Sequence, residues 1–337
     1  MPPSAPIYPL HNTTWTLHAL SPLYNRGSNL TSPETLSSHS LRLKQYLKRD
    51  AILEQAPLEP SKTGTLQSCT WTILPSKSVW QAQQRDSGSD GTPPPISEDE
   101  QLGILIMLTY DTTTYNAILV RLSADADALP DGFSSYPLLL TRLPNATRLT
   151  LLDFLSTTFD TRVSPLKLPS SFIAGLLEGY LAALTTPIAS QDGAAQAERG
   201  QRVLNVVKDI QLSFSFSNAP GLKTLDVTIN REDVLKFLAR PAPTSTVDRS
   251  DAEDSTPPFM TAISDHLYTH TALQITHPGI RLAKVSCGAF VLGASGSGDG
   301  GRMKILAVGE TGDDEERDAV EKANVGLVVG VVRWAKG

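Results

Sequence analysis

Cysteine is scarce in this sequence of 337 residues, and long hydrophobic runs are missing. Cys69 and Cys287 are too few for a disulfide framework, and neither has a histidine at metal-ligand spacing, which favours a reducing compartment, the cytosol or the nucleus. The longest apolar runs, residues 102–108 and 327–332, have the length of strands, far short of the roughly 20 residues that cross a bilayer. No signal peptide is recognisable near the N-terminus. We therefore expect no membrane association.

An excess of positive charge is also missing. The chain has 29 Lys and Arg against 35 Asp and Glu, a net charge of −6, which argues against a general polyanion-binding protein. The hydrophobic fraction of 40% suffices for a packed core. Two stretches rich in Pro, Ser, Thr and acidic residues, 86–100 and 241–258, have no apolar period and are typical of spacers. We expect an N-terminal half at 1–200 and a C-terminal, β-rich half at 201–337.

The hydrophobic periodicity predicts an α+β fold with largely antiparallel sheets in both halves and helices packed on them. The clearest signal is the two-residue alternation of Ile210–Phe216, a half-buried strand that we expect to pair with residues 222–229. The other expected strands are 66–74, 102–110 with 115–122 as a hairpin, 138–143, 282–292 with 303–308 as a hairpin, and 325–334. The expected helices are 147–159, one starting at Ser170 or Ser171, a short one capped by Asn230, 258–270 and 313–323.

No catalytic constellation is recognisable. The glycine-rich tip 293–301 has the glycine spacing of a phosphate loop, but Arg302 and Met303 follow where Lys and Ser or Thr are needed. Cys287 lies in the middle of an expected strand, as a buried structural thiol does. His266 and His270 are spaced for one helix face and have no obvious third ligand. The sequence thus predicts no catalytic residue, no cofactor and no metal; a nucleotide- or metal-binding enzyme that uses the glycine-rich loop is the alternative.

Residues 325–334 suggest binding, because they are apolar on both faces of the expected strand. Leu327, Val329 and Val331 would share one face, and Val328, Val332 and Trp334 the other. Either the chain's own sheet covers both faces, or a partner covers one of them by extending the sheet.

A basic cluster of Arg42, Lys44, Lys48 and Arg49 is the second candidate for binding. Such a cluster is either a solvated helix face or a contact to DNA phosphates.

Several segments resemble fungal members of the centromere protein L (CENP-L) family. These are Tyr8–Tyr24, Leu41–Leu47, Leu138–Pro169, Val285–Gly293 and Gly301–Leu306, in the expected order along the chain. The resemblance implies a non-enzymatic subunit of the inner kinetochore in the nucleus, within the constitutive centromere-associated network, that supports chromosome segregation.

The resemblance also implies a heterodimer with centromere protein N (CENP-N) through β-sheet surfaces of the C-terminal halves. Other inner-kinetochore subunits are further expected partners, and centromeric nucleosomes and DNA would be reached mainly through the complex. Self-association into a homodimer stays open. On this sequence the pairing surface would comprise Val325, Leu327, Val328, Val329, Val331, Val332 and Trp334, together with Val285 and Phe290.

Overall fold

The computed structural model describes most of the chain, and its fold is α+β, with mostly antiparallel strands and helices packed on them. Its contacts divide the chain into two compact units. Unit 1 holds residues 1–9, 15–166 and 331–337, and unit 2 holds residues 10–14 and 167–330. The described residues are 7–27, 29–53, 64–86, 96–122, 129–185, 193–217, 221–239, 258–294, 299–307 and 314–337.

Most of both expected spacers lies outside the described residues, which leave out 87–95 and 240–257. The same holds for residues 295–298 of the glycine-rich tip.

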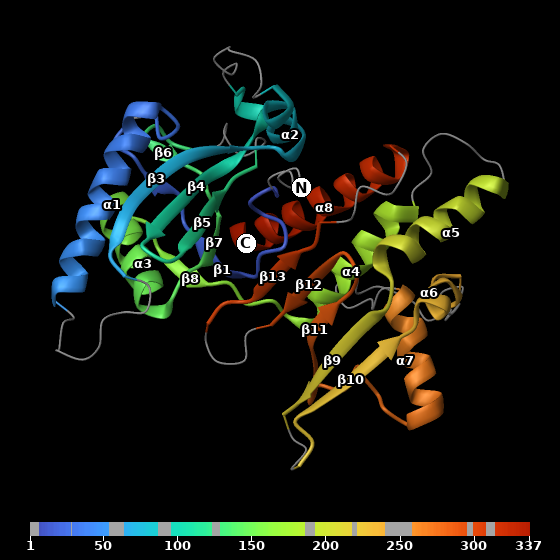
Figure 1. Cartoon of the computed structure of the whole chain (residues 1–337). Coiled ribbons are helices and arrows are strands. Elements are labelled where there is room, and N and C mark those ends of the chain that lie inside the picture. Colours follow the sequence, from blue (N-terminus) through green and yellow to red (C-terminus); the bar gives the residue numbers. More distant parts are fainter. Residues whose placement is uncertain are drawn as a thin grey trace. The chain divides into compact units, whose positions relative to one another are not determined.

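Unit 1 contains eight strands and three α-helices in its described part (Figure 1). They are β1 (Trp15–Leu20), β2 (Leu23–Tyr24), α1 (Pro33–Leu53), β3 (Leu66–Pro75), α2 (Lys77–Asp86), β4 (Gln101–Tyr110), β5 (Thr114–Val120), β6 (Phe133–Ser134), β7 (Leu138–Arg142), α3 (Asn145–Phe159) and β8 (Val163–Pro165).

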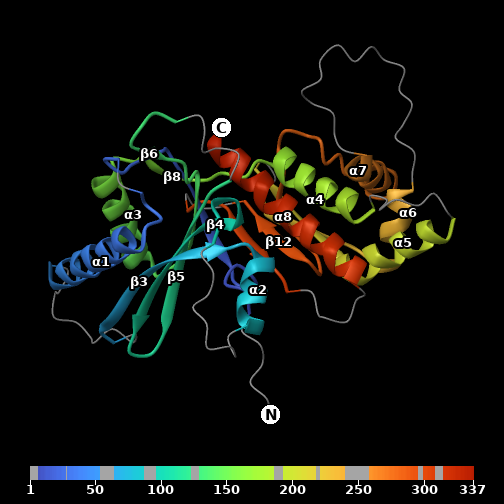
Figure 2. The ribbon, with the colours of Figure 1, turned by 90° about the horizontal axis from the view of Figure 1, so that it is seen from above.

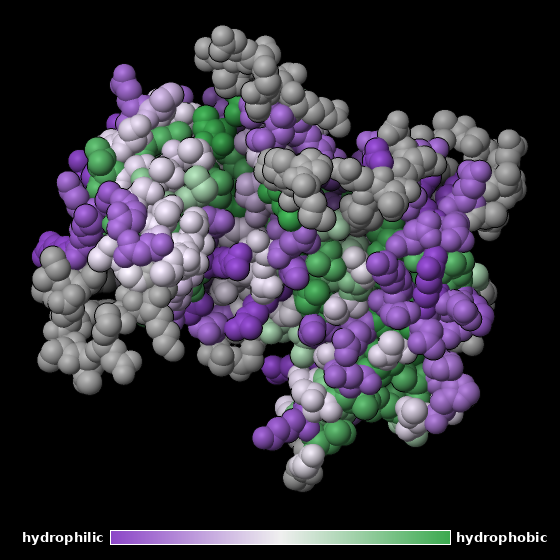
Figure 3. Space-filling view, viewed as in Figure 1, coloured by the Kyte–Doolittle hydropathy of each residue, from purple (hydrophilic) through white to green (hydrophobic). Residues whose placement is uncertain are grey.

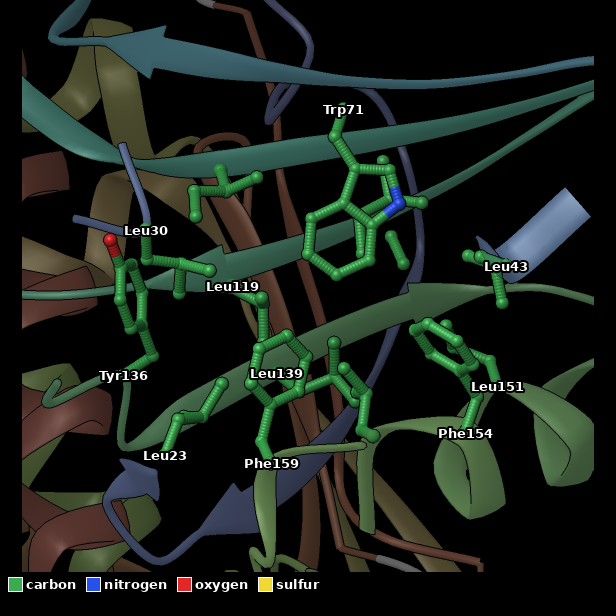
Figure 4. Packing of buried hydrophobic residues seen from close by; sticks show 14 of the residues in the cluster. Leu23, Leu30, Leu43, Trp71, Leu119, Tyr136, Leu139, Leu151, Phe154 and Phe159 are labelled. Carbon is green, nitrogen blue, oxygen red and sulfur yellow. The ribbon is translucent and has the colours of Figure 1, made fainter. Parts of the chain in front are cut away.

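The sheet of unit 1 has the strand order β3-β4-β5-β7-β1, with β8 paired to β1 and all pairs antiparallel. The predicted hairpin of β4 and β5, the strands β3 and β7 and the helix α3 are confirmed. Helices α1 and α3 pack together over a core in which Trp71, Phe154 and Phe159 lie among leucines (Figure 4). Ser32 accepts the amide N–H of Thr35 at 3.2 Å, which caps α1, and Pro33 takes the first helical position.

Unit 2 contains five strands and the remaining helices, with α8 continuing into unit 1 after Gly330. They are α4 (Ser170–Thr185), α5 (Gly193–Val207), β9 (Ile210–Phe216), β10 (Thr224–Ile229), α6 (Arg231–Leu238), α7 (Pro258–Thr271), β11 (Ile280–Ser286), β12 (Phe290–Gly293), β13 (Arg302–Ile305) and α8 (Asp314–Lys336).

The sheet of unit 2 has the order β10-β9-β11-β12-β13, again antiparallel throughout. Residues 10–14 extend it: the amide N–H of Asn12 donates to the carbonyl of Ile305 at 2.7 Å, and His11 forms a parallel bridge to Ile305. The predicted pairing of β9 with β10 and the helices α6 and α7 are confirmed. Asn230 does precede α6, but its side chain makes no capping hydrogen bond.

The predicted strand 325–334 is wrong, because these residues form the last three turns of α8 (Figure 2). The buried residues recur in neighbouring pairs four apart, 319–320, 323–324, 327–328 and 331–332, which is a helical period. Residues Asp314–Asn324 already form a helix that contains no helix-breaking residue. Because extending an existing helix costs little free energy, the valines continue it in spite of their β-branched side chains. The expected helix 313–323 and the expected strand are therefore one helix.

The predicted hairpin around the glycine-rich tip is confirmed by the pairing of β12 with β13. The predicted single strand 282–292 is wrong, because the chain turns in its middle. β11 and β12 pair with each other on either side of Cys287, Gly288 and Ala289. The amide N–H of Cys287 donates to the carbonyl of Phe290 at 2.9 Å, which closes the turn. Gly288 approaches the carbonyl of Val206 so closely that an added Cβ would lie 2.6 Å from that oxygen. Cys287 is consequently a turn residue, not the mid-strand residue that the sequence suggested.

Candidate functional site

The predicted pairing residues of α8 are for the most part interior residues. Four of these side chains are buried within the chain itself: Leu327, Val328, Val331 and Val332. Val325 and Trp334 are exposed, and Val329 is half-buried. As part of a helix, this segment has no sheet edge to offer. Its contact with a partner stays a prediction, and its predicted role as an added strand is excluded by its conformation.

Val285 and Phe290 lie inside unit 2. Both are fully buried, on the side of the sheet that the helices cover. Phe290 packs edge to face against Tyr180 of α4, with ring centroids 4.9 Å apart, and the Tyr180 hydroxyl donates to Asn324 of α8 at 3.1 Å. Figure 2 shows α4 and α8 side by side. Both predicted residues therefore stabilise the unit from within.

Strand β3 ends the sheet of unit 1, and α1 closes its edge. The backbone N–H of Trp71 donates to the Ser40 hydroxyl at 2.9 Å, and the Lys44 ammonium donates to the carbonyl of Gln67 at 2.5 Å. Both backbone groups belong to β3, and both side chains belong to α1. Helix α1 thus occupies two of the backbone groups along this edge and obstructs the approach of another strand.

Strand β10 ends the sheet of unit 2, and its outer edge is open in the described part of the chain. The amide N–H of Phe216 donates to the carbonyl of Lys223, so Lys223 points its backbone groups at β9. The alternation of antiparallel pairs then turns the backbone groups of residues 225, 227 and 229 toward β9 and those of 224, 226 and 228 outward. Three residues thus present an N–H and a C=O each to an incoming strand.

The face of the unit 2 sheet opposite to the buried face is polar and carries four cations. Lys284 pairs with Gly293, and Gly293 pairs with Arg302, so one row across the sheet places both cations on this face with only a glycine between them. Arg281 and Lys304 lie on the same face in neighbouring rows. Arg281, Lys284 and Arg302 are exposed, and Lys304 is half-buried. We call Arg281, Lys284, Arg302 and Lys304 the basic sheet face.

A β-bulge produces this arrangement. Between Leu282 and Lys284 the register of β11 with β9 shifts by one residue, which leaves Ala283 unpaired. Arg281 is opposite Ser215, and Lys284 is opposite Ser213, so both cations share the face of those serines. Without the extra residue, Lys284 would point into the core, because a shift of one residue exchanges the two faces of a strand.

The structure separates the predicted basic cluster of α1. Arg42, Lys48 and Arg49 are exposed, at positions that share one side of the helix. Lys44 lies toward β3 and bonds its backbone. Three of the four predicted cations thus form a solvated helix face, and the fourth closes a sheet edge.

The candidates for chemistry do not assemble into a site within the described residues. Burial raises the pKa of the Cys69 thiol to about 12 and that of the Cys287 thiol to about 11, so neither is a thiolate at neutral pH. The rings of His266 and His270 lie in contact at a tilted angle, with centroids 4.4 Å apart, and in the described part of the chain no third ligand joins them. The segment after the glycine-rich tip is β13, a strand as predicted, not the helix that a phosphate loop requires.

Comparison with known protein families shows to which family the chain belongs. A model of the family described as centromere protein L matches residues 9–336, nearly the whole chain. The chain belongs to the centromere protein L family. No curated protein matches the chain.

CENP-L proteins are structural components of the kinetochore, at centromeres in the nucleus, and they serve chromosome segregation. The described helices include none that is long and apolar enough to cross a membrane. In this CENP-L chain, the open edge of β10 and the basic sheet face are the features that the sequence did not reveal. Both depend on the order of the strands.

Proposed function

We propose that this CENP-L protein is a non-enzymatic adaptor that forms a heterodimer with a CENP-N-like protein by strand addition at the outer edge of β10. The pairing takes place on the C-terminal sheet, as the family resemblance implies, but at a strand other than the one first expected. Other inner-kinetochore subunits would then be reached through this pair.

The open edge of β10 carries the proposal. Strand addition takes its affinity from main-chain hydrogen bonds and its specificity from alternate side chains. The edge supplies both, since residues 224, 226 and 228 turn their backbone groups outward and Leu225 and Val227 are only half-buried. Hydrophobic residues reach the surface in the part of unit 2 labelled β10 and α7 in Figure 1 (Figure 3).

A proline at an outward position tests the pairing. Thr228→Pro removes an N–H that points away from β9, so it leaves the bonds between β9 and β10 in place. We expect at least a hundredfold weaker binding to the CENP-N-like partner in isothermal calorimetry, because one ladder bond is lost and the ring obstructs the approach of the strand. Thr228→Val keeps the N–H and is the matched control, with binding close to that of the native chain.

Thr224→Pro repeats the test at the first residue of the strand, where proline is well tolerated. Circular dichroism and thermal unfolding check that each variant folds. Native affinity in two folded proline variants would exclude β10 as the pairing edge.

A second candidate function is contact with the DNA backbone through the basic sheet face. Four cations share this face, and Asp226 is the single acidic residue in the same rows of the sheet. Clustered cations attract phosphates even on a protein of net negative charge, because screening limits electrostatic attraction to roughly 10 Å.

Salt dependence separates this candidate from the α1 cluster. In the purified heterodimer, Lys284→Gln with Arg302→Gln should lower the slope of log affinity for DNA against log salt by about 2, since each lost phosphate contact lowers it by roughly 0.9. Arg42→Gln with Lys48→Gln is the matched control on the exposed side of α1. An unchanged slope in the sheet variant and a reduced one in the helix variant would move the DNA contact to α1.

A further inference from the structure

We infer that the strand of the partner carries a lysine or arginine directly opposite Asp226 and apolar side chains at the two flanking positions. This inference rests on the proposed pairing at β10, and it specifies the chemistry of the segment that binds there. It follows from the two faces of β10 and from the position of Asp226 in its row.

The two faces of β10 differ in polarity. Leu225 and Val227 are paired with Phe214 and Leu212 of β9, whose side chains are buried on the helix-covered side. Thr224, Asp226 and Thr228 occupy the opposite, open side and are exposed. An added strand must continue both faces, so it needs apolar residues beside Leu225 and Val227 and polar residues beside Asp226.

The carboxylate of Asp226 has no cationic partner in the described part of the chain. Its neighbour on β9 is Ser213, and the next residue of the row, Lys284 of β11, lies two strands away, at roughly 10 Å. No ion pair of Asp226 is formed with any described residue. The other side of Asp226 is the position of the incoming strand, where a directly opposite side chain has its Cβ about 5 Å away.

The backbone geometry places the partner residue precisely enough to define a pair. Asp226 turns its N–H and C=O outward, so in an antiparallel addition it exchanges both hydrogen bonds with the residue opposite. The side chains of such a pair leave the sheet on the same face, the open one. A cation there neutralises the only carboxylate in the rows of the basic sheet face.

Charge reversal at Asp226 in the full chain tests this inference. We expect Asp226→Lys to weaken binding of the CENP-N-like partner about tenfold at low salt and Asp226→Asn about threefold, because a like-charge pair repels whereas a neutral pair only loses the attraction. This loss of affinity should become smaller as the salt concentration is raised to 0.5 M. Asp265→Lys on the exposed surface of α7 makes the same change of net charge in the same unit and is the matched control, with native affinity expected.

Rescue identifies the opposing residue. Single Lys→Glu and Arg→Glu substitutions in the partner are tested against Asp226→Lys, and one of them should restore most of the lost affinity. Equal affinities of Asp226→Lys and Asp265→Lys, while Thr228→Pro still weakens binding at least a hundredfold, would overturn the inferred cation and leave the pairing at β10 intact. Native binding by folded Thr228→Pro would overturn the pairing itself and this inference with it.

Discussion

The two terminal strands β3 and β10 end their sheets in opposite ways. β3 is the more apolar strand, with Cys69 and Trp71 buried in its middle, and α1 occupies its edge through Ser40 and Lys44. β10 alternates exposed polar with half-buried apolar residues and has no such cover in the described part of the chain. An apolar edge left open is a site of aggregation, whereas an edge with threonine and aspartate at its outward positions stays soluble until a specific strand arrives.

The largest effect is expected from loosening the helix that closes β3. Leu43 of α1 is fully buried in the core of unit 1, so Leu43→Ala should lower the free energy of unfolding of that unit by about 2–5 kcal/mol. Gln45→Ala on the exposed side of the same helix should change it by less than about 0.5 kcal/mol. Urea unfolding of the full chain measures both.

Leu43→Ala should leave the affinity at β10 unchanged in the folded protein, because β10 belongs to the other unit. A parallel loss of partner binding under conditions where the variant is folded would contradict the independence of the two edges.

A smaller effect is expected from removing a single edge contact. Ser40→Ala takes away the acceptor of the Trp71 N–H and leaves a buried donor without a partner, which costs about 1–3 kcal/mol. Hydrogen exchange at the Trp71 amide should accelerate accordingly. Ser38→Ala, on the exposed side of α1, is the matched control, and equal exchange in both variants would show that α1 does not close this edge.

Acid should weaken the packing of α1 on the closed edge. His39 of α1 is buried against Phe159 and Trp71, with ring centroids 4.8 and 5.6 Å apart, and desolvation, aided by the charge of Arg42, lowers its pKa from 6.5. The unfolded chain therefore binds a proton that the folded chain resists. The free energy of unfolding is therefore highest above pH 6.5, where His39 is neutral in both states, and it decreases as the pH falls below 6.5.

His39→Phe, which is never protonated, should flatten the dependence of unfolding on pH between 7.5 and 5.5. Thermal unfolding across this range measures the effect. An unchanged slope in this variant would assign the acid sensitivity to other groups.

Periodicity predicted the elements whose two faces differ. Ile210–Phe216 alternates strictly because one face is buried and the other is polar, and both the strand and its pairing with β10 are confirmed. Residues 325–334 are apolar at nearly every position, so a period of two and a period of four fit equally well. The sequence signal for a helix is the uninterrupted helical lead-in that begins at Asp314. The pairing of buried residues four apart is visible only in the structure.

The candidate site could not be predicted because it arises from strand order. β9 pairs with β11 across more than 60 residues, and the bulge at Ala283 decides which way Lys284 points. No local pattern shows that Arg281, Lys284 and Arg302 share a face, or that β10 ends the sheet. The start of α1 was not predicted, although Ser32 and Pro33 follow the rules for helix caps and would have indicated it.

The smallest effect tests whether residues 325–334 are helical. If they are, they add no strand to the sheet of unit 2, and β10 is its terminal strand. Gly326 is exposed, and a Cβ added there meets nothing within 4 Å, so intrinsic propensity alone decides the outcome. In a helix, Gly326→Ala should raise the free energy of unfolding by up to about 1 kcal/mol, and Gly326→Val should raise it less. In a strand the order reverses, because valine is favoured over alanine there. Since both variants fill the same open space, the sign of the difference between them in urea unfolding reports the backbone conformation directly.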